Sequence, residues 1–310
     1  MNKARTSAYV SVILAMIFWG ITFVLFKFAA ESFTPVTIIF LRLFVSIFFL
    51  FGFALLFKRL GRIKRKDQKW FILMALFEPF FYFLGEANGL MLVSPTVGAV
   101  MISTIPLFVP FGAYYFFKEK LSKLNIIGLI ISFGGVLMVV LNKSSGTATD
   151  PKGILLLFVA VFAAVGYTLI ARKLVEDYNP ITITSYQSFY GLIMFTPFFL
   201  FRELPLPNLD SISNTSILSV LYLGVFGSGI CFILLTTAMR ELGAAKANIF
   251  ANIVPVVAAL VSFWLLKEPM PLMKVAGILV AIAGLLMTQV GTISWKMPLK
   301  KGGFRHPPYS

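Results

Sequence analysis

The chain is poor in the residues that most catalytic, redox and metal sites need. Its 310 residues include one cysteine and one histidine, and 13% are charged, against about 25% in a typical soluble domain. The single cysteine, Cys231, cannot form an internal disulfide or a cysteine cluster. No GxxxxGKS or GxxxxGKT sequence is present, so the chain lacks a phosphate-cradling loop for ATP. These absences argue against a metalloenzyme, a redox protein or an ATPase, and no cofactor is expected.

Hydrophobic sequence, in contrast, is abundant. It makes up 59% of the chain, more than a soluble fold of this length could bury. Several apolar runs approach the roughly 20 residues that cross a bilayer as a helix. The apolar segments are at about 8–28, 36–57, 69–90, 95–117, 124–141, 153–173, 181–201, 215–238, 246–266 and 272–291. The sequence therefore predicts an all-α integral membrane protein with ten transmembrane helices.

Basic residues are distributed unevenly among the connections. The chain holds 27 Lys and Arg residues against 12 acidic ones, and the largest cluster lies between residues 58 and 69. If the N-terminus is cytoplasmic, most of these basic residues fall on the cytoplasmic side, as the positive-inside rule requires. We therefore predict a multi-pass protein of the cell membrane with both termini inside. The basic tail at 292–310 is expected to be cytoplasmic and disordered.

The net charge of +15 is explained by these membrane flanks. Basic residues beside a spanning helix meet the anionic head groups of lipids. Membrane lipid is therefore an expected partner, together with a small-molecule substrate. Nucleic acid is not, because the chain contains no soluble basic domain.

A skeleton of five residues recurs in the two halves, 149 positions apart. It consists of a proline, a Lys-Glu pair after eleven intervening residues, and two glycines beyond. The copies are Pro106, Lys118, Glu119, Gly128 and Gly135, and Pro255, Lys267, Glu268, Gly277 and Gly284. Because a unit of five helices is odd-numbered, the second copy enters the membrane upside down. We predict one five-helix repeat at 8–141 and a second, inverted one at 153–291.

Residues ahead of the skeleton carry a family resemblance. The first half has Trp19-Gly20, then Pro35 and Arg42. Together with the skeleton, these residues resemble the EamA family of the drug/metabolite transporter superfamily over roughly residues 8–290. The second half departs from the pattern, since it has Ala164-Val165 in place of Trp-Gly and Gln187 in place of Arg42.

The resemblance implies a fold and a way of working. The fold is ten helices as two inverted EamA-type repeats of five. The activity is export or exchange of small metabolites by alternating access. The central cavity in this family is lined mainly by the first, third, fourth, sixth, eighth and ninth helices, and the fifth and tenth are peripheral.

The third segment carries the strongest candidates for a site. Glu78, Tyr82 and Glu86 are spaced to share one helix face, and Glu78 falls close to the bilayer midplane. A carboxylate there costs at least about 2.5 kcal/mol, so it must be paired, protonated or exposed to water. We expect Glu78 to bind a substrate or a proton; the alternative is a structural carboxyl bonded to a neighbouring helix. Arg42, at a similar depth to Glu86, either pairs with it or extends outward to the membrane surface.

The matching positions of the second half are neutral. They are Gly227, Cys231 and Leu235. Segment nine instead offers Asn248 and Asn252, one helical turn apart, and Asn252 either hydrogen-bonds a substrate or stabilises a kinked helix. Gln187 and Trp19 complete the candidate substrate-binding residues, although Trp19 and Tyr167 are also typical of lipid contact.

The recurring skeleton is interpreted as framework. Pro106 and Pro255 fall near the middle of their segments and are either paired hinges beside the cavity or ordinary membrane prolines. The glycines give segments five and ten a face of small residues for close packing, within the bundle or between the protomers of a homodimer. The two Lys-Glu pairs are expected to be solvated turns.

The leading hypothesis is a secondary transporter of a small metabolite, with amino acids or related compounds as candidates and proton coupling through Glu78. An exchanger of sugar phosphates or nucleotide sugars would need several cations in the cavity, which Arg42 alone does not supply. A membrane-embedded enzyme would need facing His, Asp or Cys groups, but the aspartates all fall in connections. They are Asp67, Asp150, Asp177 and Asp210. A non-transporting scaffold is the last alternative.

Overall fold

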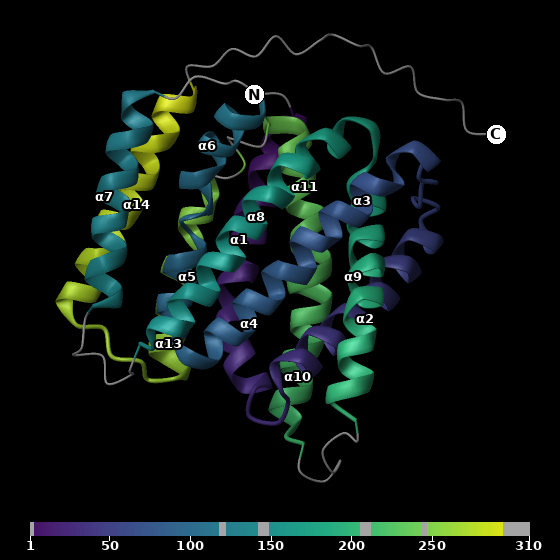
Figure 1. Ribbon diagram of the computed structural model, residues 1–310, viewed down its shortest axis with the longest axis horizontal. Helices are drawn as coiled ribbons and strands as arrows, with labels where there is room; N and C mark the ends of the chain where they lie inside the picture. The colour runs from purple at the N-terminus through teal and green to yellow at the C-terminus, as the bar shows by residue number, and fades with distance from the viewer. Residues whose placement is uncertain are drawn as a thin grey trace.

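The computed structural model describes residues 3–117, 122–141, 149–204, 212–243, 247 and 249–293. Within these ranges every regular element is a helix, and Figure 1 shows the helices packed side by side as a bundle. Lys118-Glu119, Asn248 and the predicted cytoplasmic tail from residue 294 onward lie outside the described residues.

The first half of the chain contains seven labelled α-helices and two short segments of other helical geometry. They are α1 (Lys3–Ala29), α2 (Pro35–Leu56), the 3-10 turn η1 (Arg65–Asp67), α3 (Gln68–Ala75), the π-helical turn η2 (Leu76–Phe81), α4 (Tyr82–Leu92), α5 (Pro95–Ile102), α6 (Ile105–Phe117) and α7 (Lys123–Val140). The chain runs from α3 through η2 into α4 without a loop. These three elements together form the predicted third segment.

The second half follows a similar order. Its elements are α8 (Pro151–Asp177), α9 (Pro180–Arg202), α10 (Asn214–Tyr222), the π-helical turn η5 (Leu223–Ile230), α11 (Cys231–Leu242), the 3-10 turn η6 (Ile249–Asn252), α13 (Ile253–Leu265) and α14 (Leu272–Ile293). The π-helical turn again joins two helices, α10 and α11, into one long segment.

Several helices begin with the same N-terminal capping arrangement. In α2, α5, α8 and α9 a proline is the first residue, and the side chain before it accepts a hydrogen bond from the backbone of the first turn. Proline suits this position because the first-turn N–H groups have no partner within the helix. The capping side chains are Thr34, Ser94, Asp150 and Asn179. The sequence thus marks these helix starts unambiguously.

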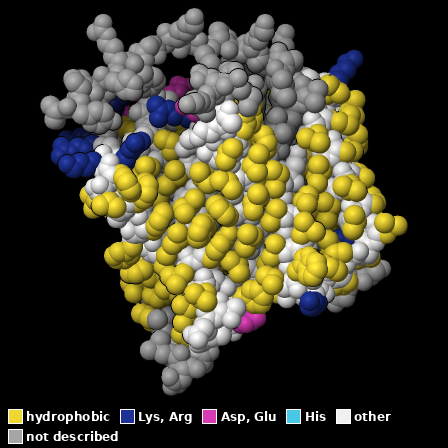
Figure 2. Space-filling view, turned by 180° about the vertical axis from the view of Figure 1, so that it is seen from behind, with side chains coloured by type: hydrophobic (Ala, Val, Ile, Leu, Met, Phe, Trp, Pro, Cys, Tyr) yellow, Lys and Arg dark blue, Asp and Glu magenta, His cyan; other side chains and the backbone are white. Residues whose placement is uncertain are grey.

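The surface of the bundle is largely hydrophobic. Figure 2 shows apolar side chains over the middle of one face, with Lys and Arg gathered towards its edges. Within the described part of the chain, six helical stretches are long and apolar enough to cross a membrane, and three shorter apolar helices accompany them. The chain is therefore a multi-pass membrane protein.

Glycines bring α7 and α14 together, and the two helices stand side by side in Figure 1. A Cβ atom added to Gly135 would lie 2.3 Å from the nitrogen of Ala281, and one on Gly284 would lie 2.3 Å from the nitrogen of Ser132. Both distances are far inside van der Waals contact, so only glycine permits this approach. The predicted role of the glycines in close packing is confirmed, and the contact joins the two halves of one chain.

Two predicted helices are broken where the sequence has proline. Segment four stops at Ile102, at the end of α5, and resumes as α6 three residues later. A proline ring crowds the carbonyl four residues earlier, and for Pro106 this is the carbonyl of Ile102. In segment nine, η6 gives way to α13 just ahead of Pro255. Both prolines therefore lie at breaks in their helices, while movement at these breaks stays a prediction.

The third segment is not the uniform helix that the spacing of its acidic residues assumed. Glu78 has φ −143° and ψ 114°, which is extended rather than helical, and it sits inside η2. Pro79 follows it and lacks an N–H to continue the helical hydrogen bonds. The predicted common helix face is therefore wrong at Glu78, whose side chain is placed by the interrupted turn instead.

Candidate functional site

A cavity lies at the meeting point of helices from both halves of the chain. Its walls come from α1, α2, η2, α4, α5, α6, α8, α11, η6 and α13. Among the described residues, none from α7, α9 or α14 lines it. The helices that form the walls agree with those that the family resemblance implied, except that α2 also contributes Arg42.

One wall of the cavity is charged. Arg42 Nη1 lies 3.6 Å from Glu86 Oε2, and both side chains are buried. Tyr82 donates a hydrogen bond of 2.8 Å from its hydroxyl to Oε1 of Glu86. Each carboxylate oxygen of Glu86 therefore has a partner, as a buried charge requires. The predicted pairing of Arg42 with Glu86 is confirmed, and the alternative of an outward-extending Arg42 is wrong.

Arg42 also connects the two halves of the chain. Its Nε donates a hydrogen bond of 2.9 Å to the hydroxyl of Ser228, which belongs to η5. Its guanidinium carbon lies 4.0 Å from the centre of the Phe83 ring, close enough for a cation–π contact. A planar guanidinium can donate several hydrogen bonds and stack on an aromatic ring at the same time. The ammonium group of a lysine could not make all of these contacts from the same position.

Glu78 lines the same cavity and is buried. Its main-chain carbonyl accepts a hydrogen bond of 3.1 Å from Nε2 of Gln187. Its carboxylate, however, has no hydrogen bond or ion pair with any of the described residues. The cavity thus contains two carboxylates and one guanidinium, and Glu78 is the charge without a counterion.

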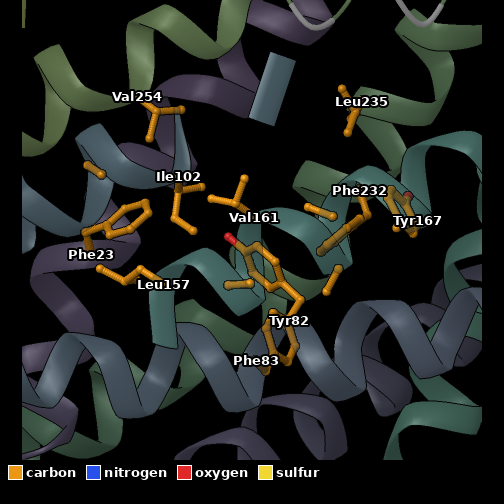
Figure 3. Close-up of a cluster of buried hydrophobic side chains, with 14 of the residues drawn as sticks. Phe23, Tyr82, Phe83, Ile102, Leu157, Val161, Tyr167, Phe232, Leu235 and Val254 are labelled. Atoms are coloured by element: carbon orange, nitrogen blue, oxygen red, sulfur yellow. The ribbon is translucent and has the colours of Figure 1, made fainter. Parts of the chain in front are cut away.

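A second group of lining residues is aromatic. Trp19 and Tyr167 each pack edge-to-face against Phe232, with ring centres 5.1 Å and 5.9 Å apart. The Trp19 ring is held in place because its Nε1 donates a hydrogen bond of 2.9 Å to the carbonyl of Gly227. Figure 3 shows Tyr82 projecting from α4 into a cluster that includes Tyr167 and Phe232. The expectation of lipid contact for Trp19 and Tyr167 is wrong, since both line the cavity.

Tyr167 was not among the candidate site residues. It is buried, and its hydroxyl finds no hydrogen-bond partner among the described residues. A tyrosine hydroxyl inside a protein usually has a partner, so Tyr167 has a donor free for a bound molecule. A signal was present in the sequence, because Gly166 and Thr168 beside it interrupt a long apolar segment.

The broken helices line the cavity at matching positions. Ile102 and Ile105 flank the break in the first half, and Ala251 and Val254 flank the break in the second. These residues correspond to each other at the repeat offset of 149 positions. Pro106 lines the cavity as well, whereas Pro255 does not.

Two of the predicted substrate-binding residues, Gln187 and Asn252, do not line the cavity in this structure. Gln187 lies behind Glu78 and supports its backbone. Asn252 is buried at the end of η6 without a partner for its side-chain amide among the described residues, so neither of its predicted roles is decided. Asn248 is outside the described residues.

The turn between α13 and α14 differs from the predicted solvated turn. Lys267 is exposed, but Glu268 is buried and accepts hydrogen bonds from Lys274 and, at 2.7 Å, from the hydroxyl of Thr96. Burial alone would raise the pKa of Glu268, but hydrogen bonds from Lys274, Ser94 and Thr96 and the charge of Lys274 hold it below its usual value of 4.5. Protein donors replace water here, so the prediction of a solvated turn is wrong for Glu268.

Comparisons with known proteins agree on one family. The EamA-like transporter family matches residues 6–141 and 151–290. A protein of Archaeoglobus fulgidus named as an uncharacterized transporter is 31% identical over 269 residues, which cover 85% of this chain and 92% of the relative. Uncharacterized transporter YetK of Bacillus subtilis is 25% identical over 293 residues, covering 93% of this chain and 88% of YetK.

The fold also matches a solved structure. A protein known by its crystal structure aligns with a TM-score of 0.70 over 92% of this chain and 98% of its own. Its sequence is 14% identical, so the likeness concerns the fold alone.

Proposed function

Because the chain belongs to the EamA-like transporter family, we propose that it is a secondary transporter that carries a small metabolite by alternating access. The observation that carries the proposal is the central cavity, which Arg42, Glu78 and Glu86 line together with a group of aromatic residues. Buried charges in a membrane bundle are costly and mark sites where a solute or proton is handled. The chain would lie in the cell membrane with both termini in the cytoplasm.

The two-repeat arrangement is part of this proposal. The chain would form ten helices as two inverted repeats of five, at 8–141 and 153–291. Matching irregularities support it, since η2 and η5 interrupt one long segment in each half and a break precedes Pro106 and Pro255. Transporters built from inverted repeats bind their substrate where the repeats meet, and the cavity is at such a place.

A zwitterion such as an amino acid, or a related compound, fits the chemistry of the cavity. A carboxylate could share the guanidinium of Arg42, and an ammonium group could pair with the free carboxylate of Glu78. The side chain of such a substrate would contact Trp19, Tyr167 and Phe232. One cavity would then recognise both charged ends and the apolar part of a single molecule.

Proton coupling through Glu78 follows from the same geometry. A carboxyl without a fixed counterion can hold a proton when the site is empty and release it when a cationic group enters. Glu86 is less suited to this role, because both of its oxygens already have partners in Arg42 and Tyr82. Binding of proton and substrate would then be mutually exclusive at Glu78.

The exchange of sugar phosphates or nucleotide sugars is the weaker alternative. Among the described residues Arg42 is the only Lys or Arg that lines the cavity, and it is already paired with Glu86. A phosphate group would meet one shared guanidinium and a second, unpaired carboxylate. The balance of charge therefore disfavours an anionic substrate.

Transport in proteoliposomes tests the proposal. Purified protein would be assayed for uptake and counterflow of radiolabelled amino acids, related amines and phosphorylated sugars, with and without a pH gradient. We expect counterflow for members of the first two groups and none for the phosphorylated sugars. Counterflow of phosphorylated sugars alone would support the alternative, and no movement of any compound in a broad panel would favour a scaffold.

A further inference from the structure

The loop from α13 to α14 lies at the end of the bundle opposite the start of α1, towards the bottom of Figure 1, and it carries a group of interacting charged and polar residues. Glu268, in the loop from α13 to α14, is bonded to Lys274 and to Thr96. Nearby on α1, Lys27 donates a hydrogen bond to the main-chain carbonyl of Leu90, at the end of α4. We call the three residues Glu268, Lys274 and Thr96 the Glu268 latch.

The latch is buried to an unusual degree for a loop contact. The exposed fraction is 0% for Lys274 and 4% for Glu268. Charged residues are almost never fully buried unless they are paired and hydrogen-bonded, and both conditions hold here. The main chain fixes the position as well, since the N–H of Glu268 donates to the carbonyl of Ser262 at 3.2 Å.

The latch lies just beyond the cavity along the helices that form its walls. On α1, Phe23 lines the cavity and Lys27 follows one turn later. On α5, Ile102 lines the cavity and Thr96 precedes it by six residues, or about 9 Å along a helix. On α4, the cavity residue Glu86 lies one turn before Leu90, whose carbonyl accepts the hydrogen bond from Lys27. The latch therefore closes the same end of several cavity walls.

The bonds of the latch differ in what they connect. Glu268 and Lys274 are six residues apart in the second half, so their ion pair can move as a unit. The bond from Thr96 to Glu268 instead joins the first half to the second. Ser94, also in the first half, donates a second hydrogen bond to Glu268. Breaking these two bonds separates Glu268 from the first half and leaves its carboxylate neutralised by Lys274. Such an opening avoids the large cost of an unpaired buried charge.

The sequence has no counterpart of the latch in the inverted position. At the offset of 149 positions, Glu119 corresponds to Glu268, but Asn125 stands where Lys274 would be matched and Ala245 where Thr96 would be matched. The lysine and the threonine of the latch therefore have no counterpart at the matching positions of the sequence.

We propose that Glu268 is a positioning residue for transport, which holds one mouth of the cavity closed through Thr96 while Lys274 keeps its charge paired. This inference rests on the proposed transport function. Opening of this mouth breaks the hydrogen bonds that Glu268 accepts from Thr96 and Ser94 and leaves the ion pair intact. Because the inverted position lacks these partners, the latch biases the protein towards the state in which this end is closed.

Accessibility of a cavity cysteine tests the latch without any substrate. The probe is Ile102→Cys in a Cys231→Ala background, reconstituted in liposomes and labelled with a membrane-impermeant maleimide from each side in turn. Thr96→Val removes one of the two hydrogen bonds that Glu268 accepts from the first half and leaves the ion pair in place. We expect it to raise the labelling rate from the latch side about tenfold, the effect of losing one hydrogen bond to a buried carboxylate. Thr96→Ser keeps the hydroxyl and should restore the slow rate.

Thr37→Val is the matched control. Thr37 also donates its hydroxyl to a glutamate of the other half, Glu203, at 3.2 Å, but neither residue lines the cavity. Its labelling rate should stay within about twofold of the parent, since its partner Glu203 follows α9, a helix that contributes no described lining residue. A tenfold rise in Thr37→Val, or an unchanged rate in Thr96→Val, would overturn the proposal. Should Thr96→Val fail to fold, the double variant Glu268→Met with Lys274→Met removes both charges and the acceptor of the Thr96 hydrogen bond together and should give the same rise, and an unchanged rate there would equally overturn it.

The labelling result and the transport result can fail separately. Faster labelling of Thr96→Val in a protein that carries none of the tested compounds would support the latch and remove the proposed substrates. An unchanged labelling rate in a protein that shows counterflow would remove the latch and leave transport standing.

Discussion

The π-helical turns η2 and η5 occupy matching places in the two halves but hold different groups. In η2 the residue at the centre is Glu78, and in η5 the matching residue is Gly227. The helix packed against each turn contributes a side chain from the other half. Arg42 bonds Ser228 in η5, and Gln187 bonds the carbonyl of Glu78 in η2.

The comparison shows that the backbone geometry repeats in the two halves, whereas the charged residues do not. The two turns, the two helix breaks and the paired glycines repeat in both halves, so they belong to the framework. Among the described residues, the Arg and Glu side chains of the cavity come from the first half alone. The charged side chains thus lie on one wall of the cavity, whereas the helical framework around them is present in both halves.

The largest expected effect comes from making the first half resemble the second at the arginine. Arg42→Gln leaves the buried carboxylate of Glu86 without its ion-pair partner, which typically costs about 3–5 kcal/mol. We expect a large fall in the free energy of unfolding in detergent and loss of transport. The double variant Arg42→Gln with Glu86→Gln should regain much of the stability without regaining transport. Equal instability of the double variant would mean that the ion pair is not the cause.

The framework side of the comparison is tested by the glycines. Gly135→Ala and Gly284→Ala each force a methyl group to within 2.3 Å of a backbone nitrogen, and each should cost about 1–3 kcal/mol of unfolding free energy. Gly134→Ala is the control, because nothing lies within 4 Å of its added Cβ. It should be neutral or stabilising by up to about 1 kcal/mol through helix propensity. A loss of unfolding free energy in only one of the two variants, Gly135→Ala or Gly284→Ala, would show that the two halves do not pack equivalently.

A smaller effect is expected at the hydroxyl that supports Glu86. Tyr82→Phe removes one hydrogen bond of 2.8 Å to a buried carboxylate and keeps the ring. We expect a loss of about 1–2 kcal/mol in unfolding free energy and a weaker apparent affinity for substrate. Tyr167→Phe is the useful comparison, since its hydroxyl has no partner among the described residues. Tyr167→Phe should leave stability unchanged and alter transport only for substrates that accept a hydrogen bond.

The last effect is a dependence on pH, and it concerns the charged contact that the second half does possess, at Glu268. Its pKa in the folded protein is held below the usual 4.5 by Lys274, Ser94 and Thr96, against the opposing effect of burial. A lowered pKa means that Glu268 adds stability above about pH 4.5 and that this contribution is lost as the pH falls through the folded value. The stability difference between wild type and Glu268→Gln should therefore be present at pH 7 and shrink below about pH 4. A difference that grows on acidification would contradict the lowered pKa.

Part of the site could be predicted from the sequence for a physical reason. A charged residue in a long apolar segment cannot easily reach water, so an ion pair between Arg42 and Glu86 within the bundle could be predicted. The spacing of the small residues in segments five and ten likewise follows directly from helix geometry, which puts every fourth or seventh residue on one face.

Other contacts depended on how separate segments come together, which local patterns do not encode. Gln187 reaches Glu78 only because α9 packs against η2. Glu268 and Lys274 follow a helix end, where charged residues are normally solvated, and only the approach of Thr96 on α5 buries them. The interrupted turn at Glu78 was also missed, because helical spacing was applied across the Glu78-Pro79 bond as if the segment were continuous.

The central claim is that the unpaired carboxylate of Glu78 couples transport to protons. The most direct test is counterflow and pH-gradient-driven uptake of one transported compound by Glu78→Gln in proteoliposomes, beside wild type. Because no described residue bonds the carboxylate, the variant should fold normally and should lose stimulation by the pH gradient. Uptake by Glu78→Gln that is still driven by the pH gradient as strongly as in wild type would contradict the claim.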